Sequence, residues 1–396
     1  MGVVVQKFGG SSVASPDKIG DVANVVCARR KAGDDVVVVV SAMGKTTDEL
    51  LALARRVSKG ADGTSLDPPR RELDMLVSTG ERVSMALLAI AIAARGFEAI
   101  SFTGSQSGII TNDRHFDARI IEVRPHRIED ELARGRVVIV AGYQGMSYRR
   151  EITTLGRGGS DTTAVALAAA LGAEHCEIYS DVDGVYSADP RSVPAARHLP
   201  ELDYQTMQEM AEVGAKVLNA QAVEWARRQR VVIHARRTAD IASGGGRETL
   251  VSDAGTASAL AVVGERRLAR LRVEPSAAER LLEAAAEAEL NVRDASLHGE
   301  SFVGLAPLLS VPDAARVRGR LESLALPGFA WEEGLGAVSL VGVGAADPRL
   351  LARVLRLGAS SLLGVMSGPL RVSALVPEGA VEQHERLLHA EFVEPT

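Results

Sequence analysis

Hydrophobic and polar positions along the first 250 residues predict strands that alternate with helices. Five apolar, strand-like runs stand out, and stretches with helical spacing separate them. These runs are VVVQKF (3–8), DVVVVVSAM (35–43), RVVIVAGYQG (136–145), AEHCEIYSDVDG (173–184) and RVVIHARR (230–237). A parallel strand that is covered on both faces has a continuous apolar sequence rather than a strict alternation. We therefore predict a three-layer α/β sandwich with a mostly parallel central sheet over residues 1–250.

A different pattern begins near residue 258. It reads strand, helix, strand, strand, helix, strand, and then repeats. The first set starts with the strand RLARLRV (267–273) and ends with a short strand, GFAWEEG (328–334). The repeat starts with the strand AVSLVGVG (337–344). We predict two tandem ferredoxin-like α+β modules of roughly 65 residues each, at 258–335 and 336–396. Such modules serve regulation or oligomerisation more often than catalysis, and this tail carries no cluster of catalytic side chains.

Amino-acid composition limits the kinds of binding partner and the cellular compartment that we expect for this protein. Of the 396 residues only 4% are aromatic, and the formal net charge is −6. These values disfavour a nucleic-acid or anionic-membrane surface. Cys27 and Cys176 stand in apolar segments without metal-like spacing, which is typical of reduced, buried thiols. The apolar runs fall short of the about 18 residues of a membrane span. Met1 leads directly into a strand rather than a signal peptide, so we expect a cytoplasmic protein.

Polar turns that contain glycine follow the predicted strands or open the predicted helices. They are KFGGSS (7–12), SAMGKTTDEL (41–50), VSTGERVSMALL (77–88), GRGGSD (156–161) and SDVDGVYSADPR (180–191). GRGGSD has neither the Lys-Ser/Thr end of a P-loop nor the spacing of a dinucleotide-binding turn. Glycine lets a backbone approach a phosphate, and the free N–H groups at a helix N-terminus attract anions. Ligands of open α/β sheets bind at the carboxyl ends of the strands, so the five turns predict one shared site.

Together with FTGSQSGI, VAGYQGM, TTLGRGGSDTTAVALAAALGA and EVGAKVL, these motifs resemble those of the aspartate kinase family in order and spacing. The match is dense over the first 250 residues, and the GER turn and the GRGGSD loop occur jointly in that branch of the amino-acid kinase superfamily. The tail resembles the family's paired ACT modules in less detail. The resemblance implies the amino-acid kinase fold. It also implies ATP-dependent phosphorylation of the side-chain carboxylate of L-aspartate to 4-phospho-L-aspartate, the first step of the aspartate-family amino-acid pathway.

The resemblance also implies roles for individual residues. The catalytic residues are Lys7, Asp161 and Lys216, with the lysines on the phosphates and Asp161 orienting them. The substrate-binding residues are Ser41, Thr47, Glu81, Arg157, Gly158, Gly159 and Ser160. The ATP-binding residues are Lys7, Phe8, Gly9, Gly10, Ser11, Tyr179, Ser180, Asp181, Val185, Tyr186, Asp189, Pro190 and Lys216.

The chemistry of these side chains fits the implied roles. Arg157 has the planar fork that holds a carboxylate, and Glu81 suits the substrate ammonium. Mg²⁺ is expected to accompany ATP. No Asp/Glu cluster forms a dedicated protein cage, so we expect phosphates and water to supply most of its ligands and predict no protein metal site.

Alternative interpretations remain for single residues and for the whole chain. Lys216, Glu81 and Asp181 could be solvated surface charges, the commonest fate of such residues. Lys216 is followed by VLNAQAVEW, where the family usually has a His-Pro-Arg triplet. His115 is interpreted as a surface or supporting histidine and stays outside the site.

Besides an active aspartate kinase, the chain could be a paralogue for another small acidic amino acid. It could also be a non-catalytic amino-acid sensor. Glu81 and Arg157 fit an α-amino acid with a second carboxylate. Intact Lys7, Arg157 and Asp161 argue against a sensor.

The tail departs from the family where effectors bind. The first ACT strand of regulated aspartokinases typically ends in Asp-x-Pro-Gly, whose bare N–H groups meet the effector carboxylate. Here the stretch is RLRVEPSAAERLL, with Glu274 and Pro275 but no glycine, and the second module has Pro348 without a following glycine. Glu274 also places a negative charge at the helix N-terminus, where it would repel a carboxylate. We expect the tail to serve homodimerisation, with weak or absent feedback by lysine and threonine.

Overall fold

The computed structural model describes residues 2–60, 66–156, 158–243, 246–254, 260–309, 311, 313–358 and 361–394. The chain divides into two compact units. The first comprises Met1–Val185, His198–Ala211 and Lys216–Thr256. The second comprises Tyr186–Arg197, Glu212–Ala215 and Ala257–Thr396.

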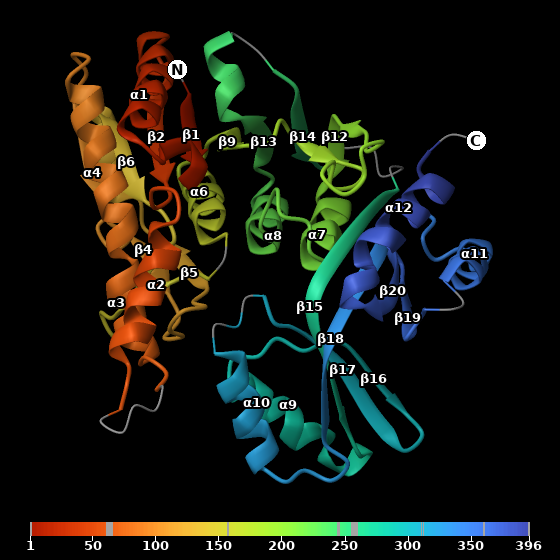
Figure 1. Cartoon of the computed structure of the whole chain (residues 1–396). Helices are drawn as coiled ribbons and strands as arrows, with labels where there is room; N and C mark the ends of the chain where they lie inside the picture. The colour runs from red at the N-terminus through yellow and green to blue at the C-terminus, as the bar shows by residue number, and fades with distance from the viewer. Residues whose placement is uncertain are drawn as a thin grey trace. The chain divides into compact units, whose positions relative to one another are not determined.

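The first unit is built on an eight-stranded sheet in the order β12-β14-β13-β9-β1-β2-β6-β3 (Figure 1). The strands are β1 (Val3–Phe8), β2 (Asp35–Val40), β3 (Ala99–Phe102), β6 (Val137–Ala141), β9 (His175–Ser180), β12 (Glu201–Asp203), β13 (Val232–Arg237) and β14 (Glu248–Ser252). Every neighbouring pair is parallel except β13 and β14. The mostly parallel sheet predicted from the sequence is thereby confirmed.

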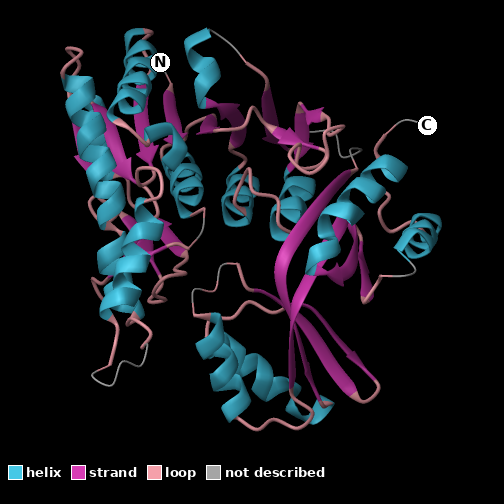
Figure 2. Cartoon of the chain, viewed as in Figure 1, coloured by secondary structure: helices cyan, strands magenta, loops and turns pink. Residues whose placement is uncertain are grey.

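Helices lie on both faces of this sheet (Figure 2). The helices of this part of the chain are α1 (Pro16–Lys31), α2 (Thr46–Val57), α3 (Arg70–Val77), α4 (Thr79–Ala93), α5 (His126–Ala133), α6 (Gly159–Ala170), α7 (Tyr204–Glu212) and α8 (Ala220–Gln229), with 3-10 turns η1 (Gly10–Val13) and η2 (Thr238–Ser243). Alternate residues of a strand point to opposite faces. Val4 and Phe8 of β1 pack in a core with α1 and α4, whereas Lys7 meets α6 on the other face. The three-layer prediction is therefore confirmed as well.

Local sequence explains where the first helix begins. Pro16 occupies its first turn, where the missing N–H is not needed. Ser15 caps it by accepting a hydrogen bond from the Lys18 N–H at 3.3 Å. A smaller sheet, in the order β5-β4-β7-β8, and the two-stranded pair β10-β11 complete the strands of this part of the chain. Their bounds are β4 (Ile109–Thr111), β5 (Ile120–Val123), β7 (Gln144–Ser147), β8 (Ile152–Thr154), β10 (Val185–Tyr186) and β11 (His198–Leu199).

Helices α3 and α4 follow one another across Ser78. Together they form the one helical stretch of the described chain, Arg70–Ala93, that is long and apolar enough to cross a membrane by length and composition. Leu88 and Ile92 of this stretch are fully buried in the core beneath the sheet. Of the 18-residue window 44% is buried, and a single stretch of this kind is weak evidence for a membrane span, because core helices of soluble proteins meet the same criteria.

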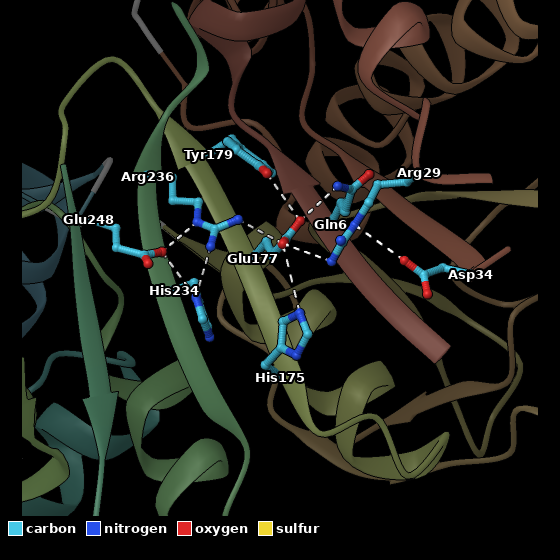
Figure 3. A network of polar contacts seen from close by, with 9 residues as sticks. All are labelled: Gln6, Arg29, Asp34, His175, Glu177, Tyr179, His234, Arg236 and Glu248. Carbon is cyan, nitrogen blue, oxygen red and sulfur yellow. Dashed lines mark hydrogen bonds and ion pairs between the residues drawn. The ribbon is translucent and has the colours of Figure 1, made fainter. Parts of the chain in front are cut away.

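A buried carboxylate joins the central strands on the face that carries α1 (Figure 3). Glu177 of β9 accepts hydrogen bonds from Gln6 Nε2 at 2.7 Å and from Arg236 Nη1 at 2.8 Å. Burial disfavours the charge of Glu177, but hydrogen bonds from His175 and Gln6 and the nearby arginines hold its pKa at about 2. This network connects β1, β9 and β13 on the face opposite Lys7.

The second unit contains a six-stranded antiparallel sheet in the order β16-β17-β15-β18-β20-β19 (Figure 1). Its strands are β15 (Ala261–Val273), β16 (Arg293–His298), β17 (Ser301–Pro307), β18 (Ala330–Val341), β19 (Gly364–Gly368) and β20 (Arg371–Pro377). Its helices are α9 (Ala278–Glu287), α10 (Ala314–Ser323), α11 (Pro348–Gly358) and α12 (Val381–Phe392), with 3-10 turns η3 (Pro275–Ala277) and η4 (Glu378–Ala380). One hydrophobic core forms with α9 and α10 and another with α11 and α12, and a smaller buried cluster lies on β15, β17, β18 and β20.

Two strands of this sheet are longer than the sequence pattern predicts. The strands expected at 328–334 and 337–344 are one continuous strand, β18, and β15 begins at Ala261 rather than at 267. Gly334 has φ +79°, and the pairing of β15 with β18 shifts register around Leu268. A bulge bends a strand without ending it. The polar and glycine residues at the bulge suggest the end of a strand in the sequence, although the strand continues through them. The predicted module boundary between 335 and 336 thus falls inside β18.

Candidate active site

The turns at the carboxyl ends of three adjacent strands are hydrogen-bonded to one another. After β1, Gly9 donates its N–H to the carbonyl of Tyr179 on β9 at 3.1 Å. On the other side, the Ser41 N–H donates to the Phe8 carbonyl at 3.1 Å. The Gly44 N–H donates to the Gly10 carbonyl at 3.0 Å. The turn after β1 therefore lies between the turns after β9 and β2.

Two glycines allow backbone segments to approach here. A Cβ on Gly10 would lie 2.8 Å from the Ala42 carbonyl oxygen, which is closer than such atoms can pack. Gly158 precedes α6 with φ +70°, a conformation that suits glycine, and a Cβ there would lie 2.6 Å from Asn219 Cβ. Both positions require glycine for packing, beyond any role in ligand binding.

A buried ion pair joins β1 to the first turn of α6. Lys7 Nζ lies 2.6 Å from Asp161 Oδ1, and both residues are buried. The Asp161 N–H donates to the Gly158 carbonyl at 2.9 Å, which begins the helix. The N-terminus of α6 therefore presents a glycine-rich backbone beside a fixed cation, an arrangement that attracts phosphoryl oxygens.

Several predicted substrate residues gather around the same helix start. Gly159 and Ser160 are buried in the first turn of α6. Ser160 packs so closely on Gly142 that a Cβ at Gly142 would lie 2.8 Å from the serine Cβ. Arg157 lies outside the described residues.

Glu81 is a buried carboxyl group with one oxygen engaged. It is 3% exposed, and its Oε1 accepts a hydrogen bond from the Ala42 N–H at 3.0 Å. Among the described residues, its Oε2 has no hydrogen-bond partner. Burial raises the pKa of Glu81 to about 7, against the hydrogen bond from Ala42. A buried oxygen without a partner is costly unless a ligand supplies a donor.

Ser41 lies close to this carboxyl group. The Ser84 hydroxyl, on the same helix as Glu81, donates to the Ser41 carbonyl at 2.7 Å. Thr47 stands in the first turn of α2 and is half-buried. Ser41 thus lies against the helix that carries Glu81. Ser41 and Thr47, both predicted to bind the substrate, are partly exposed.

Two residues predicted to bind ATP turn their side chains away from this face. The rings of Phe8 and Tyr179 stack with centroids 4.9 Å apart, and Phe8 lies in the core with α1. The Tyr179 hydroxyl donates to Glu177 Oε2 at 3.0 Å, inside the network of Figure 3. The strand alternation that points Lys7 at α6 points both rings the other way, so only their main-chain atoms can serve a nucleotide.

The other predicted ATP residues divide between the two units. Gly9, Gly10 and Ser11 form the turn after β1, whereas Ser180 is the last residue of β9 and the exposed Asp181 follows it. Val185 is buried, and its N–H donates to the Thr249 hydroxyl at 2.8 Å.

Lys216 is exposed and belongs to the first unit, whereas Tyr186, Asp189 and Pro190 belong to the second. The described geometry therefore assembles only the part of this set that lies in the first unit.

Sequence reasoning missed a buried aspartate that supports the glycine-rich turn. Asp74 of α3 is 0% exposed and accepts hydrogen bonds from the Thr154 hydroxyl at 2.5 Å and the Phe116 N–H at 3.0 Å. His115 Nδ1 lies 2.6 Å from the same carboxylate, and burial raises the pKa of Asp74. Thr154 stands two residues before Gly156, so this cluster anchors the strand that leads into the turn. His115 thus contacts the buried carboxylate of Asp74.

No group of three or more His, Cys, Asp or Glu residues in the described parts of the chain could hold a metal ion.

Comparison with known proteins places this geometry in a family. The model of the amino acid kinase family matches residues 2–235. An aspartokinase of Corynebacterium glutamicum is 42% identical over 413 aligned residues, which cover 99% of this chain and 96% of the relative. An aspartokinase of Mycobacterium bovis is 56% identical over 237 residues, covering 60% of this chain and 55% of the relative.

Solved structures agree with the sequence comparisons. The crystal structure of E. coli aspartokinase III in complex with aspartate and ADP has a TM-score of 0.86 and 26% identity, covering 99% of this chain and 100% of that one. A match along almost the whole length of an aspartokinase, in sequence and in fold, means that this chain belongs to the amino acid kinase family, in its aspartokinase branch.

Proposed function

We propose that this protein transfers the γ-phosphoryl group of ATP to the side-chain carboxylate of L-aspartate, giving 4-phospho-L-aspartate and ADP. The observation that carries the proposal is the buried Lys7–Asp161 ion pair at the glycine-rich start of α6. The aspartate and ADP bound to the related aspartokinase III support the choice of substrate and of nucleotide.

The reaction makes modest chemical demands on the protein. A carboxylate is ionised at neutral pH and attacks phosphorus without a general base. Two anions must be held in line, and the charge on the transferring phosphoryl oxygens must be offset. Lys7 supplies positive charge beside backbone N–H groups, and Asp161 holds the ammonium in place and prevents it from reaching elsewhere.

The nucleotide occupies the ends of β1 and β9. Main-chain groups of Gly9 and Gly10, with Ser180 and Asp181 on the neighbouring turn, contact it, and Lys216 contacts its phosphates. Mg²⁺ would accompany ATP and would neutralise part of the phosphate charge. The chain contributes turns that orient the phosphates. It does not contribute a cage of carboxylates for the metal ion.

The amino-acid pocket selects a substrate with one ammonium and two carboxylates. Glu81 offers its unpartnered oxygen to the α-ammonium group. Arg157 receives a carboxylate through its planar fork, and Ser41, Thr47 and Ser160 complete the pocket.

A coupled assay of ADP release with Mg-ATP tests the proposal. L-aspartate, L-glutamate and N-acetyl-L-glutamate are compared at equal concentrations. Only L-aspartate is expected to support rapid turnover, because an N-acylated substrate has no ammonium for Glu81. Faster release with either of the other two acids would assign the chain to a different substrate.

Replacing Arg157 with lysine is expected to raise the KM for aspartate about 10-fold, with a smaller effect on the KM for ATP. Lysine keeps the charge but not the two parallel N–H donors that grip a carboxylate. Steady-state kinetics with each substrate varied in turn measures the difference. An unchanged aspartate KM would remove Arg157 from the pocket.

The tail is proposed to form ACT-like modules that pair two copies of the chain into a homodimer. The core with α9 and α10 and the core with α11 and α12 support two α+β modules. Because β15 and β18 run through both halves of the sheet, we propose that Ala261–Glu265 supplies the first strand of the second module. The protein is proposed to act in the cytoplasm.

Feedback by lysine and threonine is expected to be weak or absent. Glu274 precedes the 3-10 turn before α9 without a side-chain cap bond, in extended backbone geometry. The negative charge of Glu274 repels an effector carboxylate. Without a Pro-Gly pair the backbone N–H groups cannot approach that carboxylate closely. The kinase assay at subsaturating aspartate, with lysine and threonine singly and together, is expected to give less than twofold inhibition. Strong inhibition by either amino acid, or by the pair, contradicts the proposal.

A further inference from the structure

A threonine outside the predicted site joins two of the turns at the carboxyl edge of the large sheet. Thr238 follows directly on β13 and is the first residue of η2. Its hydroxyl donates a hydrogen bond to the Ser180 carbonyl at 3.1 Å and lies 2.6 Å from the Ser12 hydroxyl. Ser180 ends β9, and Ser12 belongs to η1, the turn after β1. One side chain therefore bridges turns from two different strands, and all three residues lie within the first unit.

The number of available protons fixes the direction of both hydrogen bonds. A threonine hydroxyl has one proton to donate and lone pairs that accept. A carbonyl oxygen can only accept, so the proton of Thr238 goes to Ser180. The Ser12 hydroxyl then donates its own proton to the Thr238 oxygen. The two bonds form a chain that runs from Ser12 through Thr238 to Ser180.

This chain of hydrogen bonds gives the two serines of KFGGSS different tasks. Ser12 is 4% exposed, and its N–H donates to the Gly9 carbonyl at 2.9 Å. Its hydroxyl proton is used on Thr238, so it has none left for a phosphate. Ser11 is exposed in the same turn, and its carbonyl accepts a hydrogen bond from Lys18 Nζ at 2.8 Å. Ser12 therefore holds the turn, and Ser11 is the serine whose side chain a ligand can reach.

The turn after β9 is held by further contacts within the same unit. The Ser180 hydroxyl accepts a hydrogen bond from the Val182 N–H at 3.2 Å, which closes a local turn. The Gly9 N–H donates to the Tyr179 carbonyl at 3.1 Å, which is a main-chain link between the two turns. Thr238 adds a side-chain link to it. Neither turn can move away from the other without breaking a hydrogen bond.

We infer that Thr238 is a positioning residue for the nucleotide, because its hydroxyl holds the turns after β1 and β9 at a fixed spacing. The inference rests on the proposed function, which puts ATP at these two turns. Thr238 acts through the turns and not by touching ATP. Turns that are ordered in the free protein bind a ligand more tightly, since less freedom is lost on binding. The amino-acid pocket depends on other contacts, such as those of Glu81 and Ser41.

Three variants of the full chain separate the effect of the hydroxyl from that of the rest of the side chain. Thr238→Val keeps the shape of threonine and removes both hydrogen bonds. Thr238→Ser keeps the hydroxyl and removes one methyl group. Thr206→Val is the matched control, because the Thr206 hydroxyl donates to Asp203 at 2.7 Å, only three residues away in the same unit.

Thr238→Val is expected to raise the KM for ATP about 10-fold, the effect of roughly one lost hydrogen bond, and to leave the aspartate KM within about twofold. Calorimetric titration with Mg-ATP in the absence of aspartate should show the same loss of affinity. Thr238→Ser and Thr206→Val should both stay within about twofold of the wild type in these measurements. A hydrogen bond with a purely structural role would lower the unfolding temperature of Thr238→Val but leave its ATP affinity unchanged. That result would overturn the inference.

Ser12→Ala tests whether the bridge acts through both of its ends. Alone, it should weaken Mg-ATP binding, because it releases the turn after β1 from Thr238. Combined with Thr238→Val, it should add less than about twofold, because the shared hydrogen bond is already lost. Additive losses, or equal effects of Thr238→Val and Thr238→Ser, would contradict the inference.

The same titrations distinguish this inference from the proposed function. If the wild-type chain binds Mg-ATP but releases no ADP with aspartate, the proposed function fails, and the affinities of the variants for Mg-ATP still decide the role of Thr238. A wild-type chain that binds no Mg-ATP would overturn both.

Discussion

Replacement of Lys7 by methionine is expected to lower kcat about 100- to 1000-fold, the usual effect of removing one group that stabilises a transition state. Lys7 is the cation that Asp161 fixes at 2.6 Å beside the start of α6. The charge it offsets grows as the phosphoryl group moves, so kcat should fall more than either KM rises. Steady-state ADP release with saturating aspartate and Mg-ATP measures the change.

The variant needs controls for folding, because Lys7→Met leaves the buried Asp161 without its partner. Breaking a buried pair from one side costs about 3–5 kcal/mol of stability. Lys7→Met combined with Asp161→Asn removes both charges and should recover most of that loss, yet it should stay as inactive as the single variant. Lys31→Met, at the exposed end of α1, should keep wild-type activity. Full turnover in folded Lys7→Met would disprove the phosphate assignment.

The sequence predicts the sheet, and the edge at which the glycine-bearing turns meet, because both follow from local patterns. Apolar runs such as 35–40 predict strands buried on both faces, and Gly-bearing turns follow the predicted strand ends. Since parallel strands end at the same edge, the meeting of Gly9, Gly10 and Gly44 could be expected without any structure.

What the sequence could not provide depends on side-chain direction and on long-range packing. KFGGSS does not reveal that Lys7 faces α6 while the Phe8 ring faces α1, because that requires knowing which helix covers which face. Asp74 looks like one polar position of an amphipathic helix until Thr154 and His115, far along the chain, close around it. Likewise, nothing local in EVGAK shows that the residues before Lys216 pack against Glu265 and Arg293.

Replacement of Glu81 by glutamine is expected to raise the aspartate KM roughly 100-fold, because removing one partner of a buried charge pair typically costs 2–5 kcal/mol. The unpartnered Oε2 would pair with the substrate ammonium. Glutamine keeps the size of the side chain and an acceptor oxygen but loses the charge. The KM for ATP should change little, and comparison of the two KM values measures the selectivity of the effect.

The pH dependence of the wild-type enzyme gives a second measure of the same group. Burial raises the pKa of Glu81 to about 7, so near neutrality half of the free enzyme carries a proton there. Aspartate binds the ionised form, and the aspartate KM should therefore fall roughly 10-fold between pH 6 and pH 8. In Glu81→Gln this dependence should vanish. A wild-type KM that is flat over this range would contradict the assignment of the ammonium to Glu81.

Stability should change with pH in the opposite sense to affinity. The pKa of Glu81 rises from an ordinary 4.5 in the unfolded chain to about 7 in the folded one. Between these values the folded state binds the extra proton, so the free energy of unfolding falls as pH rises. Above pH 7 the loss reaches roughly 3 kcal/mol, since each pKa unit corresponds to about 1.4 kcal/mol.

Glu81→Gln should therefore be as stable as the wild type near pH 4 and more stable than it at pH 8, although it binds aspartate worse. Denaturant unfolding at the two pH values tests this, and saturating aspartate should restore the stability of the wild type alone. Equal stability of the two proteins at pH 8 without substrate would mean that the buried charge of Glu81 does not destabilise the fold. It would also contradict the pairing of its free oxygen with a positively charged ligand.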